Sequence, residues 1–167
     1  MKVAIREYWQ NLKTEYETTY KVSIFSDYNV LKEYVECFKT YLNGLLHEHP
    51  HDLNIVCALA TVEQVLRHEE DSIQLLEEFL RKYIEELSDT DKARVYTNLA
   101  FYYNDEGNIK EYDYLSAAVK LNSPYIETYR GLALYHFSVY REKGSAEDLK
   151  RSLHAFEKGR TVSDGYE

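Results

Sequence analysis

Proline and glycine are scarce in this chain, which has two prolines and six glycines among 167 residues. All-β proteins rely on frequent turns rich in these residues, whereas helical bundles need few of them. The two prolines, Pro50 and Pro124, also lie far apart, so each can mark one helix boundary. The shortage favours an all-α fold before any periodicity is considered.

Cysteines and long apolar runs are rare as well. The two cysteines, Cys37 and Cys57, have no paired spacing, which suits buried free thiols in a reducing compartment. The first residues lack the apolar run of a signal peptide, and no stretch approaches the roughly 20 apolar residues of a membrane span. These absences predict a cytoplasmic protein that does not bind membranes.

Positive charge is also limited, because 20 Lys and Arg face 29 Asp and Glu, for a net charge of −9. Proteins that bind nucleic acid usually concentrate Lys and Arg to neutralise phosphates, so direct binding of DNA or RNA is not expected. An acidic surface could instead block a basic protein or mimic nucleic acid. An acidic inhibitor or immunity-type protein is therefore the alternative function.

Sequence motifs of catalysis are missing. There is no glycine-rich phosphate loop, Gly-x-Ser-x-Gly elbow, His-Glu-x-x-His or Cys-x-x-Cys. His47, His49 and His51 alternate in a segment around Pro50 and could share a metal ion there, which would allow a metal-dependent enzyme. Histidines in a loop between helices are more often solvated, and no distant ligand is evident. We therefore expect no enzyme, no cofactor and no functional metal.

Apolar periodicity and capping residues predict about eight helices in a single domain spanning residues 1–167. The helices cover approximately residues 3–22, 27–47, 53–67, 72–86, 92–105, 109–121, 124–143 and 146–160. Short connections make neighbouring helices antiparallel. The domain would consist of an N-terminal helix pair (1–50), helix pairs that repeat (51–160) and a frayed tail (161–167).

Helix boundaries follow from local signals. Glu69-Glu70-Asp71 is interpreted as an acidic turn before a helix that starts at Ser72. Ser123 and Pro124 are interpreted as the N-cap and first residue of the seventh helix, since proline is favoured there. Ser145-x-x-Asp148 predicts a capping box at the start of the last helix.

A Leu-Ala pair recurs along the chain. Leu99-Ala100 aligns with Leu132-Ala133 at an offset of 33 residues, and Leu59-Ala60 matches at an offset of 40. The shared pattern is aromatic-x-x-Leu-Ala-x-x-aromatic, in which alanine lets the paired helix approach closely. It resembles the first helix of the tetratricopeptide repeat (TPR), Trp-x-x-Leu-Gly-x-x-Tyr, whose period is 34 residues. The best match, over residues 93–124, has Tyr96, Leu99, Ala100 and Tyr103.

The resemblance implies helix pairs stacked as a short right-handed solenoid whose inner groove binds a peptide or another protein. Carrying the groove positions over residue by residue selects outward positions on the first helix of the two best-matching pairs. They are Arg94, Thr97, Asn98, Phe101 and Asn104 in the first of these pairs, and Glu127, Arg130, Leu134 and Phe137 in the second. The two arginines could form a fork for a carboxylate, so the partner is expected to offer an acidic side chain or a free C-terminus.

Overall fold

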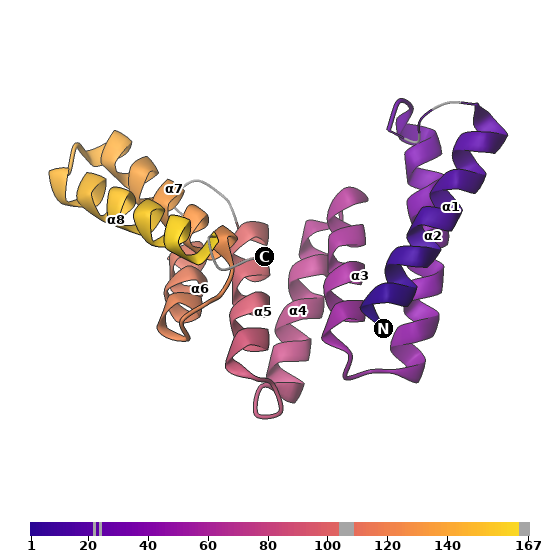
Figure 1. Cartoon of the computed structure of the whole chain (residues 1–167), viewed down its shortest axis with the longest axis horizontal. Helices are drawn as coiled ribbons and strands as arrows, with labels where there is room; N and C mark the ends of the chain where they lie inside the picture. The colour runs from indigo at the N-terminus through magenta and orange to yellow at the C-terminus, as the bar shows by residue number, and fades with distance from the viewer. Residues whose placement is uncertain (22, 24, 104–108, 164–167) are drawn as a thin grey trace. The chain divides into compact units, whose positions relative to one another are not determined.

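A computed structural model describes residues 1–21, 23, 25–103 and 109–163, and these are built from helices alone (Figure 1). The eight helices are α1 (Lys2–Tyr20), α2 (Tyr28–Glu48), α3 (Leu53–Val65), α4 (Glu69–Tyr83), α5 (Asp89–Tyr102), α6 (Ile109–Lys120), α7 (Ile126–Lys143) and α8 (Ala146–Ser163). The predicted all-α class and number of helices are confirmed for the described part of the chain. Within it, no helix is both long and apolar enough to cross a membrane.

The chain forms two compact units, residues 1–79 and 80–167. Aromatic side chains of α1 and α2 build much of the first core. The Trp9 ring lies 4.5 Å from the ring of Tyr34 and 4.9 Å from that of Phe38, both edge-on. Tyr34 is fully buried, and its hydroxyl donates to the carbonyl of Trp9 at 3.0 Å. Leu59 and other apolar residues of α3 complete this core.

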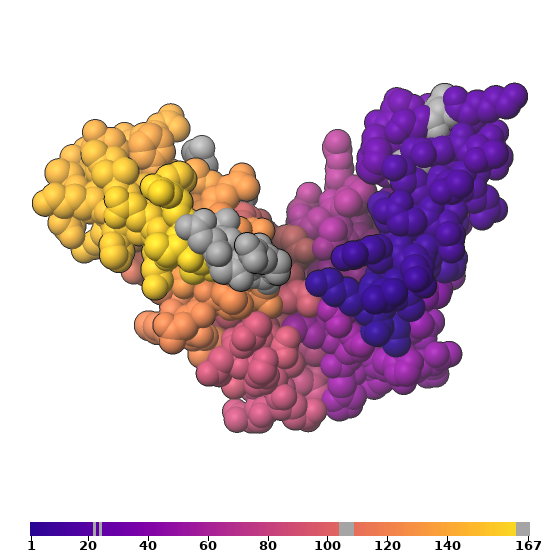
Figure 2. Space-filling view, viewed as in Figure 1, coloured from indigo at the N-terminus to yellow at the C-terminus, as the bar shows by residue number. Residues whose placement is uncertain are grey.

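In the second unit α7 packs against both α6 and α8, and α5 packs against α6 and α7. Two glycines allow close approach. A Cβ atom on Gly131 would lie 3.0 Å from Cδ2 of Leu115 on α6, and one on Gly159 would lie 3.1 Å from Cβ of Tyr129 on α7. Helix α8, in yellow, lies at the surface in Figure 2.

The alanines of the repeated pair occupy equivalent places. Ala60, Ala100 and Ala133 lie on α3, α5 and α7, the first helices of three successive pairs, and all three are buried. Their burial agrees with the expectation that these alanines face the interior.

Helix α4 begins earlier than predicted. Glu69, Glu70 and Asp71 form its first turn and not a separate acidic turn. Carboxylates are favourable at a helix N-terminus because they interact with the positive end of the helix dipole and with free backbone N–H groups. Helix α5 is shifted in the same direction. Ser88 caps it and accepts from the backbone N–H of Asp91.

Helix α7 begins later than predicted, at Ile126 with Tyr125 as N-cap, so Pro124 is not its first residue. Ser123 belongs to the end of α6 instead, because its backbone N–H donates to the carbonyl of Ala118 at 3.1 Å. Its hydroxyl accepts from the N–H of Tyr125. The predicted capping interaction in α8 is present, since Asp148 N–H donates to the hydroxyl of Ser145.

Candidate functional site

The predicted groove falls on α5 and α7, which meet through buried hydroxyl groups. Thr97 Oγ1 donates to the carbonyl of Ala93 at 2.8 Å and lies 2.7 Å from Thr128 Oγ1, which lies 2.7 Å from Ser123 Oγ. Each hydroxyl has one proton to donate. The hydroxyl of Ser123 therefore donates to Thr128, that of Thr128 donates to Thr97, and that of Thr97 donates to the carbonyl of Ala93. Thr97 is only 3% exposed. Its side chain therefore lies between the helices, which corrects its expected place on the groove surface.

On α5, the remaining predicted residues follow one side of the helix. Arg94, Asn98 and Phe101 have the spacing i, i+4, i+7 that brings side chains onto one face. Arg94 and Asn98 are half-buried and Phe101 is exposed. Asn104 was also predicted here and lies outside the described residues.

On α7, the predicted residues are more open. Arg130, Leu134 and Phe137 share a face at spacing i, i+4, i+7, and all three are exposed. Leu134 and Phe137 retain 55% and 43% of their accessible surface. We call the residues on these two helices the α5/α7 face: Arg94, Asn98, Phe101, Arg130, Leu134 and Phe137.

Single exposed apolar side chains are ordinary on protein surfaces, whereas larger groups of them often mark interaction sites. Phe101, Leu134 and Phe137 are large and come from helices that contact each other. The same helices add the guanidinium groups of Arg94 and Arg130. The residues named as the α5/α7 face thus include three exposed apolar side chains and two guanidinium groups, in a chain of net charge −9.

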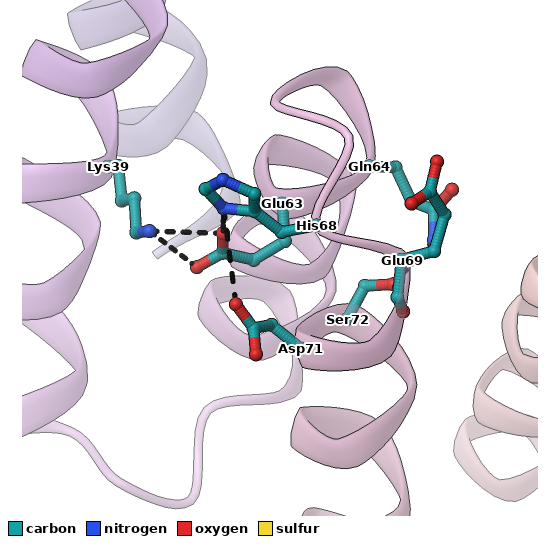
Figure 3. A network of polar contacts seen from close by, with 7 residues as sticks. All are labelled: Lys39, Glu63, Gln64, His68, Glu69, Asp71 and Ser72. Carbon is teal, nitrogen blue, oxygen red and sulfur yellow. Dashed lines mark hydrogen bonds and ion pairs between the residues drawn. The ribbon is translucent and has the colours of Figure 1, made fainter.

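In the described part of the chain, one group of side chains could hold a metal ion, and it does not include the three histidines around Pro50. His47, His49 and His51 are all exposed at the end of α2 and in the turn that follows. The group comes instead from Glu63, His68 and Asp71, whose candidate ligand atoms lie within 4.8 Å of one another (Figure 3).

Glu63 already has a cation. Glu63 is only 7% exposed, and Lys39 Nζ lies 2.9 Å from its Oε1 and 3.0 Å from its Oε2 (Figure 3). His68 Nδ1 lies 3.0 Å from Oε2 and 4.0 Å from Asp71 Oδ2. A metal ion would compete with the ammonium group for the same oxygens. The arrangement fits an ion-pair network that joins α2, α3 and α4 within residues 1–79.

Sequence reasoning missed this network because an irregular helix end assembles it. Arg67 adopts a left-handed conformation, with φ of 63°, just after α3. The N–H of His68 then donates to the carbonyl of Glu63 at 2.9 Å, and the N–H of Arg67 to that of Gln64. This is a Schellman motif, usually signalled by glycine or asparagine. An arginine at this position gives no such signal.

No family model matches the sequence, and no curated protein matches it. Two crystal structures of MamA are similar to the fold. The first is 21% identical in sequence, and the match covers 81% of this chain and 72% of the MamA chain, with a TM-score of 0.55. The second is 18% identical, and the match covers 97% of this chain and 75% of the MamA chain, with a TM-score of 0.49. MamA is a TPR-like helical repeat protein. With eight helices in its described residues and the likeness to the first structure, this chain has the fold of a TPR-like helical repeat protein.

Proposed function

We propose that this chain is a non-enzymatic protein- or peptide-binding module, an adaptor or regulatory protein, that receives a partner segment on the α5/α7 face. The observation that carries this proposal is the exposure of Phe101, Leu134 and Phe137 on two packed helices. Burying apolar surface contributes roughly 25 cal/mol per Å², and aromatic anchors often dominate binding energy. The TPR-like fold supports the proposal, because helical repeats present extended surfaces to partners.

The charges on this face suggest the kind of segment that binds. Arg130 is exposed and Arg94 is half-buried, so both guanidinium groups can contribute to a positive potential. A guanidinium binds a carboxylate through two parallel hydrogen bonds. The proposed partner therefore offers an acidic side chain or a free C-terminus, and the side-chain amide of Asn98 would bond its backbone.

The apolar part of the proposal is tested after affinity capture and mass spectrometry have identified a partner. Leu134→Ala/Phe137→Ala should weaken binding of that partner by about 2 kcal/mol or more, as expected for central apolar contacts. Leu153→Ala/Phe156→Ala is the matched control, because these α8 side chains are exposed to a similar extent. Calorimetric titration measures both variants. Equal losses in the two variants, or none in the first, would contradict the assignment.

The charged part is tested by reversing Arg94 and Arg130 to Glu. Capture should weaken by about 2–5 kcal/mol if both arginines lose water on binding. Lys2→Glu, on the exposed surface of α1, is the control and should change little. Circular dichroism melts verify that the variants fold. Capture of a basic nuclease or toxin that survives both sets of substitutions would support the acidic-inhibitor function in place of the proposed one.

A further inference from the structure

A pocket of about 570 Å³ lies in the second unit, away from the residues of the α5/α7 face. Residues of α6, α7 and α8 line it, together with Asn122 just after α6, and α7 packs against both other helices. Val119 of α6 and Leu132 of α7 give it apolar surface. Its volume lies in the range of known ligand-binding clefts, about 300–1,000 Å³.

The wall formed by α8 is basic. Lys150, Arg151 and Lys158 line it, and Glu147 is the one carboxylate among the lining residues. Arg151 is held by acidic neighbours, with Nε 3.6 Å from Glu147 Oε1 and Nη1 3.7 Å from Asp148 Oδ1. Lys150 and Lys158 have no ion-pair partner in the described part of the chain. Among the described residues, two ammonium groups without an ion-pair partner therefore border the pocket.

The spacing of the basic side chains indicates the shape of a ligand. Lys150, His154 and Lys158 follow one another at intervals of four residues on one side of α8. With a rise of 1.5 Å per residue they span about 12 Å. A single small anion contacts only part of such a row. In an extended peptide, alternate side chains lie on one side, roughly 6.8 Å apart, which is close to the spacing of this row.

We propose that this pocket binds an acidic segment of a partner protein in an extended conformation. Its carboxylates lie along Lys150, His154 and Lys158, and its alternate apolar side chains point to Val119 and Leu132. This site is independent of the proposed function, because none of its residues belongs to the α5/α7 face.

The probe for this site is a short fluorescein-labelled peptide of alternating Glu and Leu, titrated with the full chain and followed by fluorescence anisotropy. Lys150→Glu/Lys158→Glu should bind it at least about tenfold more weakly, because two favourable charge pairs become repulsive. Replacing Glu by Gln in the peptide should have a similar effect. Lys143→Glu/Arg160→Glu is the matched control. It changes the net charge equally at exposed positions of α7 and α8 that do not line the pocket.

Four results would overturn the proposal. The first is the absence of an anisotropy change with the unaltered chain. The second is an equal loss in the control variant, which would show that only net charge matters. The third is loss of peptide binding in Leu134→Ala/Phe137→Ala, which would place the peptide on the α5/α7 face. The fourth is tighter binding of a labelled single-stranded DNA with the same dependence on Lys150 and Lys158.

Discussion

Ala100 and Ala133 occupy equivalent positions on α5 and α7, where only 1% and 6% of their surface is exposed. Because both alanines are buried, a larger side chain at either position overpacks its surroundings. Ala100→Leu and Ala133→Leu should each lower the free energy of unfolding by about 1–3 kcal/mol. Ala4→Leu, on the exposed surface of α1, should leave it nearly unchanged. Chemical denaturation measures all three, and neutral results at both buried positions would remove the basis for the repeat register.

At this scale the sequence predicts apolar positions better than polar ones. The Leu-Ala pairs carry a packing signal, and the exposed positions of Phe101, Leu134 and Phe137 agree with the face predicted for them. Thr97 sits in the same helical pattern but is buried, because its hydroxyl finds a partner in Thr128 on another helix. Whether a polar side chain can be buried depends on such a partner, which helical periodicity does not reveal.

Two glycines in different places of their helices should respond in opposite directions to the same substitution. Gly144 ends α7 in a left-handed conformation, with φ of +70°, whereas Gly44 lies inside α2 with open space where a Cβ would be. Gly144→Ala should destabilise the protein by about 1 kcal/mol, because a Cβ disfavours that conformation. Gly44→Ala should stabilise it by about 0.5–1 kcal/mol, because alanine favours a helix. Thermal melts of both variants measure the difference, and shifts of the same sign would contradict the prediction.

At the scale of elements, the sequence predicts every helix but misplaces some of their ends. Acidic residues are compatible with either a turn or the first turn of a helix, so the sequence alone does not show that Glu69-Glu70-Asp71 belongs to α4. Ser123 can cap a following helix or end a preceding one. Its N–H donates to the carbonyl of Ala118, so it belongs to the end of α6. The left-handed residues Arg67 and Asn122 end α3 and α6 alike, but only asparagine is a familiar signal.

At the scale of the whole molecule, the sequence predicts the fold through the spacing of the Leu-Ala pairs, and the TPR-like structure confirms it. The basic wall of α8 could not be predicted in the same way. Net charge sums over the chain and does not show how charges group on a surface. Lys150 and Lys158 stand out only once α6, α7 and α8 define a pocket beside them.

The expectation that residues 1–167 form one domain can be tested with a probe that reports on one unit alone. Trp9 is the single tryptophan of the chain and packs in the unit formed by residues 1–79. The boundary between the units falls inside α4, between Phe79 and Leu80, so a continuous helix passes from one to the other. Because helix formation is cooperative along a continuous helix, we expect loss of one unit to destabilise the other.

Ala133 lies in the unit formed by residues 80–167, so Ala133→Leu perturbs that unit directly. In a single cooperative domain, the loss of stability would also be detected at Trp9. The midpoint of denaturation followed by Trp9 fluorescence should therefore shift as far as the midpoint followed by circular dichroism, which averages over all helices. Ala4→Leu is again the control and should move neither midpoint. If the Trp9 transition stays in place while the circular dichroism curve splits in two, the units unfold independently. In that case a partner segment bound at the α5/α7 face would stabilise residues 80–167 alone, since a ligand stabilises only the unit that must be folded to bind it.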